Sequence, residues 1–248
     1  MKKILILTII LSIAIGSGKP IFAENSSQLK STQVEKVSSL KVKKIAIALK
    51  NPVLPEKMLL DVPLLNQMDQ PRLYNGCEVT SLAMILQFNG VNVTKNELAA
   101  NVKKVPLYYS GNLSGNPNVG FVGDMENGPG LSVYNGPIVD LAKEYVGEKV
   151  VNLTNSSFTD LLKTVGQGNP VWIITTTTFT PLSSFQEWDT PQGKINITLN
   201  GHSVVITGYD KQYIYINDPF GFKNRKVERT AFIKAWEQMG SQAVVIIK

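Results

Sequence analysis

Cys77 and His202 are the one cysteine and the one histidine among the 248 residues of the chain. A zinc site needs three or four such ligands, so this pair does not predict one, and the sequence predicts no cofactor. A single cysteine also excludes a disulfide within the chain. What remains is a free thiol with at most one imidazole partner, which is either an accident of composition or a nucleophile and its base.

The residues after Cys77 have the spacing of a buried helix. Apolar side chains recur at positions 79, 82, 83 and 86, and Asn89-Gly90 ends the pattern. Cys77 therefore lies at or just before a helix N-terminus, where the helix dipole and free backbone N–H groups favour the thiolate. The alternative is a buried structural cysteine, although Gly76 favours a close chain approach that leaves the sulfur accessible.

His202 opens a predicted β-hairpin formed by residues 201–209 and 213–219. A plain hairpin centred near Lys211 places Val204 opposite Asp218, which makes Asp218 a diagonal neighbour of His202 on the same face. Asp210 lies at the turn, about 26 Å from His202 along an extended strand, so Asp218 is the better candidate to orient the imidazole. A one-residue slip would reverse this, and Asp218 before Pro219 is also typical of a turn.

Three side-chain amides precede Cys77 and are candidates to stabilise an oxyanion. Acyl transfer places negative charge on a carbonyl oxygen, and an amide beside the backbone N–H of Cys77 would meet that charge. The candidates are Gln67, Gln70 and Asn75, and spacing alone does not choose among them.

The first 23 residues are typical of a secretory signal. Lys2 and Lys3 precede an apolar run over residues 4–15, and Ala23 is a plausible cleavage point. The alternative, a membrane anchor, is disfavoured because the run is shorter than the roughly 20 residues of a spanning helix. We therefore expect export to the outside of the cell or to its surface, with no transmembrane span in the mature chain.

Charge argues against nucleic acid as a partner. Removal of the three lysines in residues 1–23 leaves 22 of the 25 basic side chains against 19 acidic ones, a net charge of +3. Much of the surplus lies in residues 30–50, within a segment (24–57) that we interpret as a linker or tether. This basic stretch is either a solvated linker or a contact with an anionic cell surface.

Residues 58–248 are long enough for one domain with a sizeable core. Helices are predicted near residues 78–88, 93–102, 137–146, 158–165 and 230–239, and strands near 171–176, 203–208, 213–217 and 243–247. Between residues 107 and 137 the chain is rich in Gly, Asn and Pro, which is typical of a binding loop or of a surface excursion. Helices first and an antiparallel sheet afterwards indicate an α+β fold.

Four segments resemble a known family of peptidases. They are Asn66-Gln67-Met68 with Asn75-Gly76-Cys77-Glu78-Val79-Thr80-Ser81-Leu82-Ala83-Met84, Gly120-Phe121-Val122-Gly123-Asp124, Gly201-His202-Ser203-Val204-Val205-Ile206-Thr207-Gly208-Tyr209-Asp210, and Asn217-Asp218-Pro219. Together they resemble the C39-like, papain-fold cysteine peptidases, in their secreted, stand-alone bacterial branch. The resemblance spans about residue 60 to the C-terminus.

The resemblance implies roles for four residues. Cys77 would be the nucleophile, His202 the base and then the acid, Asp218 the orienting group, and Gln67 the oxyanion-hole donor. It also implies a papain-like fold, with N-terminal helices packed on a C-terminal antiparallel sheet, and a peptide or protein substrate. Two alternatives remain, a hydrolase or amidase of peptidoglycan peptides with the same triad, and a C39-like binding module that does not catalyse.

Overall fold

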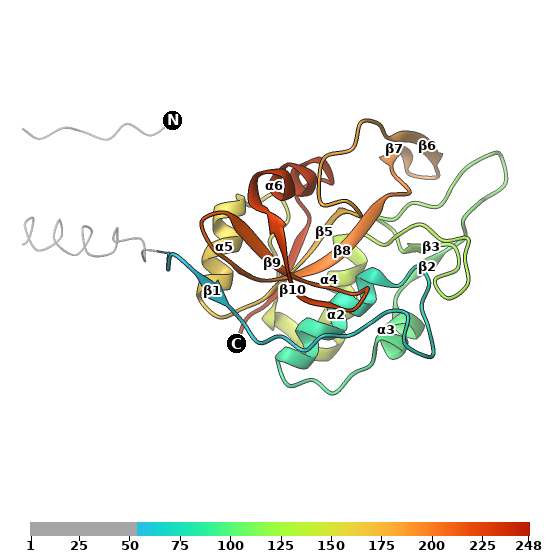
Figure 1. Ribbon diagram of the computed structural model, residues 1–248. Helices are drawn as coiled ribbons and strands as arrows, with labels where there is room; N and C mark the ends of the chain where they lie inside the picture. Colours follow the sequence, from blue (N-terminus) through green and yellow to red (C-terminus); the bar gives the residue numbers. More distant parts are fainter. Residues whose placement is uncertain (1–53) are drawn as a thin grey trace, which may run out of the picture. The chain divides into compact units, whose positions relative to one another are not determined.

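The computed structural model describes residues 54–248, which form a mixed α/β unit around a seven-stranded antiparallel sheet (Figure 1). The predicted signal segment and residues 24–53 of the predicted linker lie outside the described residues. Along the sheet the strands follow the order β10 (Phe222–Glu228), β9 (Tyr213–Asp218), β8 (Gly201–Tyr209), β5 (Val171–Thr176), β11 (Ala243–Ile246) and β4 (Val150–Asn152). The seventh strand, β1 (Met58–Leu59), pairs with the last two residues of β8.

All five predicted helices are present. They are α2 (Cys77–Phe88), α3 (Lys95–Asn101), α4 (Asn135–Val146), α5 (Phe158–Gly166) and α6 (Arg229–Gln238), and a 3-10 helix, η1 (Gly147–Lys149), follows α4. The α3 helix begins with the expected capping box, in which Thr94 accepts from the N–H of Glu97 and the Glu97 carboxylate accepts from the N–H of Thr94. None of the helices among residues 54–248 has the length and apolar character needed to span a bilayer.

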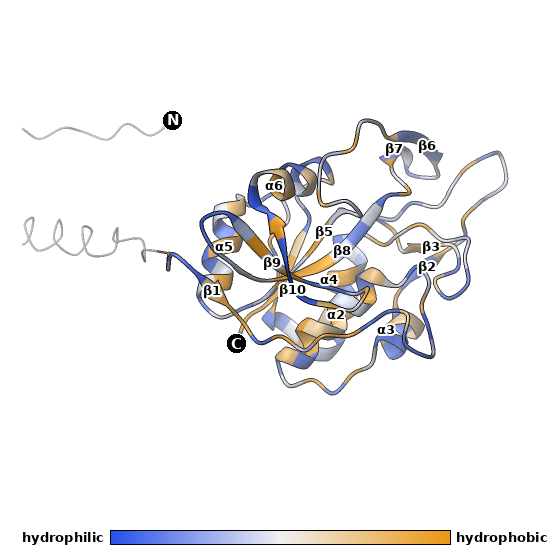
Figure 2. Ribbon diagram, in the orientation of Figure 1, coloured by the Kyte–Doolittle hydropathy of each residue, from blue (hydrophilic) through white to orange (hydrophobic). Residues whose placement is uncertain are grey.

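Helices cover both faces of the sheet, because side chains alternate along each strand. One face packs against α2, α3 and α4, and the other against α5 and α6. The first face carries Trp172, Ile174, Val205, Val244 and Ile246, and the second carries Val171, Ile173, Val204, Ile206, Ala243 and Val245. In Figure 2 much of the central strand β8 is orange, whereas the edge strand β10 is largely blue. The predicted packing of N-terminal helices on the sheet therefore applies to α2, α3 and α4, whereas α5 and α6 cover the opposite face.

The polar strands were not predicted. β10 (sequence FKNRKVE) lies at the sheet edge and is mostly exposed, and β6 (Gln186–Thr190) and β7 (Gly193–Ile197) form a separate exposed hairpin. Strands with little buried surface lack the alternating apolar pattern by which a strand is recognised. A second small sheet pairs β2 (Lys104–Val105) with β3 (Phe121–Val122) inside the long irregular stretch.

The β8–β9 hairpin contains a β-bulge at Thr207. At the turn end the pairs are Tyr209–Ile214 and Gly208–Tyr215, and beyond the bulge they are Ile206–Ile216 and Val205–Asn217. The pairs beyond the bulge follow the predicted register, whereas those at the turn are shifted by one residue. The extra residue on β8 absorbs that shift, which keeps Asp218 on the same face as His202.

Candidate active site

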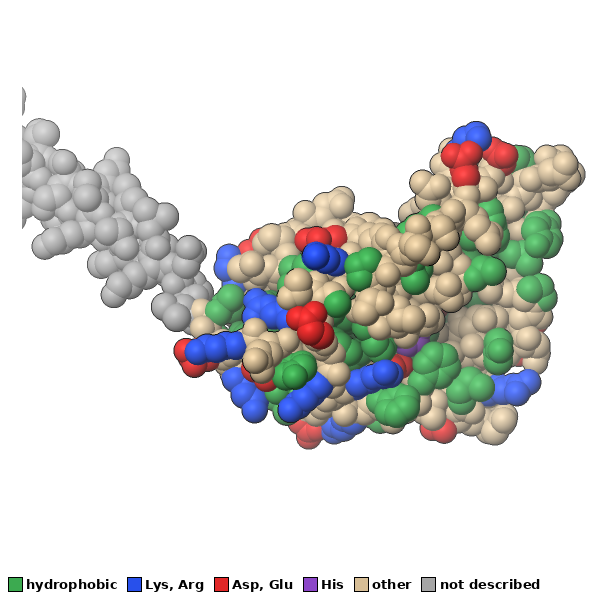
Figure 3. All heavy atoms as spheres, turned by 45° about the horizontal axis from the view of Figure 1, so that its top comes forward, with side chains coloured by type: hydrophobic (Ala, Val, Ile, Leu, Met, Phe, Trp, Pro, Cys, Tyr) green, Lys and Arg blue, Asp and Glu red, His purple; other side chains and the backbone are tan. Residues whose placement is uncertain are grey.

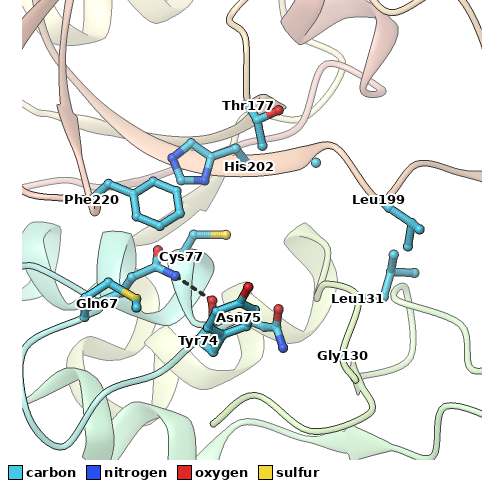
Figure 4. A pocket seen from close by; sticks show the side chains of 12 residues that line it. Gln67, Tyr74, Asn75, Cys77, Gly130, Leu131, Thr177, Leu199, His202 and Phe220 are labelled. Carbon is cyan, nitrogen blue, oxygen red and sulfur yellow. Dashed lines mark hydrogen bonds between the residues drawn. The ribbon is translucent and has the colours of Figure 1, made fainter. Parts of the chain in front are cut away.

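Cys77 and His202 line one pocket of about 250 Å³, shown in Figure 4. Cys77 is the first residue of α2 and His202 is the second residue of β8, so the helix N-terminus and the start of the strand form opposite walls. The pocket is lined by Gln67, Met68, Tyr74, Asn75, Cys77, Gly130, Leu131, Thr177, Leu199, Gly201, His202 and Phe220. In Figure 3 little of the purple His202 surface is visible, and green hydrophobic side chains lie beside it together with a red and a blue one.

Two hydrogen bonds hold α2 against the sheet near the pocket. The hydroxyl of Ser81 donates to the carbonyl oxygen of Ser203 in β8 at 3.1 Å. The indole Nε1 of Trp172 in β5 donates to the carbonyl oxygen of Glu78 at 3.0 Å. Gly76, before the helix, has no room for a side chain, because a Cβ there would lie 2.4 Å from the Cβ of Leu73. The position of Cys77 is therefore set by the packing of the whole helix.

Asp218 contacts the imidazole of His202. His202 Nε2 lies 2.9 Å from Asp218 Oδ1, and both side chains are buried. The same oxygen accepts the backbone N–H of Phe220, and Oδ2 accepts Arg225 Nη1 at 3.0 Å. Burial raises the pKa of Asp218, but the hydrogen bonds and charges of His202 and the other donors outweigh it, so the pKa lies below its ordinary value. Asp218 is thus a carboxylate, and Nδ1 is the ring nitrogen of His202 left for another partner.

Asp210, the competing carboxylate, lies at the turn of the hairpin. It accepts the backbone N–H groups of Gln212 and Tyr213 and the hydroxyl of Tyr215. These are contacts of a turn residue, and Asp210 does not line the pocket that holds Cys77 and His202.

Two aromatic rings hold the imidazole from its sides. The ring of Phe220 stacks on His202 with centroids 5.1 Å apart and an interplanar angle of 20°, and Phe179 lies 6.2 Å away in a tilted arrangement. The guanidinium of Arg225 lies over the ring of Phe179 at 4.7 Å. The imidazole is therefore restricted in rotation, and one edge of it faces the pocket.

The Cys77 thiol is buried, and its pKa lies well above the ordinary value. Burial is the main cause, and the neighbouring carboxylate of Glu78 raises the pKa further. Backbone groups of Ser203 and of Cys77 itself act in the opposite direction, but they are outweighed. The sequence led us to expect that the helix N-terminus would favour the thiolate, whereas in the folded chain desolvation and a like charge favour the thiol.

Of the three amide candidates, Gln67 and Asn75 line the pocket and Gln70 does not. Gln67 is buried, and its Nε2 donates to the carbonyl oxygens of Leu73 and Tyr74 at 3.2 and 3.0 Å, while its Oε1 has no hydrogen-bond partner in the described part of the chain. Asn75 donates to the carbonyl oxygen of Asp124 at 3.0 Å. The oxyanion role of Gln67 remains a prediction.

The third wall of the pocket comes from the irregular stretch between β3 and α4. Asp124 accepts the N–H groups of Glu126 and Asn127 through its side chain, which shapes a tight turn. The chain then returns to Gly130 and Leu131, which line the pocket. The sequence did not decide whether residues 107–137 form a binding loop or a surface excursion. Near its C-terminal end this stretch supplies a wall of the pocket, whereas residues 110–117 do not line the pocket.

Several side chains around the site were not singled out from the sequence. Phe220 and Arg225 contact His202 and Asp218, and Glu78 lies buried beside Cys77. Proximity to Cys77 in the sequence was the one available signal for Glu78. Four aromatic side chains of the irregular stretch, Tyr108, Tyr109, Phe121 and Tyr134, do not line the pocket; Tyr108 is exposed and Phe121 lies in the core.

Comparison with known proteins places the chain in a family. Residues 59–244 match the model of the Peptidase_C39 like family. The chain is 62% identical over 189 residues to the uncharacterized protein YvpB of Bacillus subtilis (strain 168), which covers 76% of each chain. It is also similar to a crystal structure of a candidate C39-like peptidase from Bacillus anthracis, with a TM-score of 0.75, 46% identity and coverage of 78% of this chain and 98% of that one.

The family match covers the helices, the pocket and nearly all of the strand residues described above, and the structural similarity extends over nearly all of the Bacillus anthracis chain. The resemblance seen in the sequence is therefore confirmed: the chain belongs to the Peptidase_C39 like family.

Proposed function

We propose that the protein is an exported cysteine peptidase that hydrolyses peptide bonds with Cys77 as nucleophile, His202 as base and acid, and Asp218 as orienting group. The main support is the hydrogen bond between His202 Nε2 and Asp218 in a pocket that also holds the chain's one thiol. Membership of a peptidase family supports the same reading.

The reaction begins with the thiol. Because burial and Glu78 keep the proton on Cys77, His202 Nδ1 takes that proton as the sulfur attacks the substrate carbonyl carbon. Asp218, ionised and bound at Nε2, stabilises the imidazolium that forms. The imidazolium then gives the proton to the leaving amine, and water attacks the thioester to release the acid and restore the thiol.

The oxyanion would lie at the N-terminus of α2. The N–H of Cys77 is in the first turn of the helix and has no partner within the helix. The Gln67 amide lies in the same pocket, and rotation of its Nε2 away from the Leu73 and Tyr74 carbonyls would supply a second donor.

The test compares the wild-type protein with Cys77→Ser and His202→Ala on a set of unstructured peptides and on purified sacculi, with new amines as the readout. Peptide cleavage that falls at least about 100-fold in both variants is the expected result. Release of amines from sacculi alone identifies a peptidoglycan peptide as the substrate. Cleavage at the wild-type rate in either variant would exclude the proposed chemistry, and a folded wild-type protein inert on both substrates would favour a binding module.

A further inference from the structure

Glu78 is a buried carboxyl group for which the mechanism above gives no catalytic role. It is the second residue of α2, directly after Cys77, and is 2% exposed. Its Oε1 accepts the hydroxyl of Ser132 and, at 3.4 Å, the backbone N–H of Val133, whereas its Oε2 is buried and has no hydrogen-bond partner among the residues that the structure describes. A buried carboxylate usually has all its acceptor sites satisfied, so this one needs an explanation.

The partners of Glu78 belong to the wall of the pocket. Ser132 and Val133 directly follow Gly130 and Leu131, which line the pocket with Cys77. One carboxylate oxygen therefore ties that wall to the N-terminus of α2. The helix N-terminus also favours a negative charge in its first turn.

The two buried carboxylates near the pocket differ in their counter-ions. Asp218 is bound by His202 and Arg225, whereas no basic side chain among residues 54–248 forms an ion pair with Glu78. Burial accordingly raises the pKa of Glu78. Burial and the charge of Glu78 also raise the pKa of Tyr134, which precedes α4, to about 12. Glu78 thus raises the pKa of two acidic groups, Cys77 and Tyr134.

We propose that Glu78 is a positioning residue whose buried carboxylate opposes formation of the Cys77 thiolate, so that the thiol keeps its proton until His202 removes it. The groups that act on the thiol are the Glu78 carboxylate from α2 and the backbone groups of Cys77 and of Ser203 in β8. His202, whose partner Asp218 is bound by Arg225, lines the same pocket. A free, permanently ionised thiolate would be alkylated or oxidised outside the cell, and the charge of Glu78 counteracts this. The benefit of a protonated thiol for catalysis rests on the proposed function. The effect of Glu78 on the ionisation of Cys77 does not depend on that function.

The test uses the single cysteine as its own reporter. The rate of Cys77 alkylation by iodoacetamide is measured by intact mass for the wild-type chain and for Glu78→Gln. The titration runs from pH 5 to pH 12, because the pKa of the thiol lies well above its ordinary value of 9.0. The glutamine retains an oxygen acceptor for Ser132 but has no charge. We expect the pH of half-maximal rate to fall by about one unit or more in this variant. Glu144→Gln, the same change on the exposed face of α4, serves as the control and should match the wild type.

An unchanged midpoint in folded Glu78→Gln would overturn the proposal. If that variant does not fold, the titration of Glu78 is followed instead in the wild-type chain, through its carboxyl ¹³C resonance. Titration of Glu78 below the alkylation midpoint supports the proposal, and a carboxyl that stays protonated through the midpoint overturns it. Neither readout requires peptide cleavage, so a chain that cleaves nothing can still support or overturn the role of Glu78.

Discussion

At the scale of single residues, the site places two buried carboxyl groups in opposite electrostatic environments. Asp218 has a histidine and an arginine as partners and stays ionised, whereas Glu78 has hydroxyl and amide donors and forms no ion pair within residues 54–248. Cys77 and His202 were found from the sequence because each is unique in the chain. Arg225 and Glu78 were not, because a charged residue in a sequence carries no sign of whether it will be buried.

Asp218 is expected to contribute to stability in a pH-dependent way. Its pKa is lower in the folded chain than its ordinary value of 3.8, so the folded state binds that proton more weakly than the unfolded state. The contribution is therefore present above pH 3.8 and is lost as the pH falls through the folded pKa. We expect Asp218→Asn to lower the free energy of unfolding at pH 7 by about 3 kcal/mol, since it leaves the Arg225 and His202 side chains without their anion.

Urea denaturation at pH 7 and at pH 3 measures this, with Asp140→Asn, a change at an exposed residue of α4, as the control. The difference between wild type and Asp218→Asn should shrink at pH 3. Equal differences at both pH values would show that the carboxylate is not the stabilising species.

At the scale of elements, α2 is attached to the sheet by the hydrogen bonds of Ser81 with Ser203 and of Trp172 with Glu78. The amphipathic helices and the apolar strands β5, β8, β9 and β11 could be predicted, because their buried positions recur with periods of about 3.6 and 2 residues. The strands β10, β6 and β7 could not be predicted, because most of their side chains are exposed and give no alternating apolar pattern.

The hydrogen bond from Ser81 to Ser203 is expected to matter for activity as well as for stability. Ser81→Ala removes a buried donor between α2 and β8, which should cost about 1 kcal/mol of unfolding free energy and lower kcat/KM severalfold. Thr94→Ala, which breaks the capping box of α3, should cost a similar amount without changing kcat/KM. Chemical denaturation and steady-state peptide cleavage separate the two, and equal loss of activity in both variants would contradict a local role for Ser81.

At the scale of the whole molecule, the pocket lies where three parts of the chain that are distant in sequence meet. The N-terminus of α2, the start of β8 and the loop that ends at Gly130 and Leu131 each supply one wall. Their convergence could not be derived from the sequence, because the irregular loop has no periodic pattern and its course depends on contacts with residues about 50 positions away, such as that between Asn75 and Asp124.

Gly130 is expected to control the shape of the cleft. A Cβ there would lie 2.4 Å from the carbonyl oxygen of Asp124 and 3.0 Å from Asn75 Nδ2, so Gly130→Ala must displace the wall. We expect KM to rise about tenfold and the unfolding free energy to fall by about 1–3 kcal/mol. Gly136→Ala in α4, whose Cβ would meet its nearest atom at 3.8 Å, should leave KM unchanged. A KM in Gly130→Ala equal to that of Gly136→Ala would show that substrates do not contact this wall.

The bulge at Thr207 has a consequence for the way in which related sequences are aligned. Between the turn and the pair formed by His202 and Asp218, β8 contains one residue more than β9, and this residue is Thr207. A relative that lacks a residue at the bulge, or that has a longer turn after Asp210, keeps that pair on a common face. A relative with a one-residue gap between His202 and Ile206 does not, because every side chain in that stretch would change sides. We therefore expect insertions and deletions in this hairpin to fall at Thr207 or in the turn, and a gap elsewhere in it to mark a chain that has lost the pair.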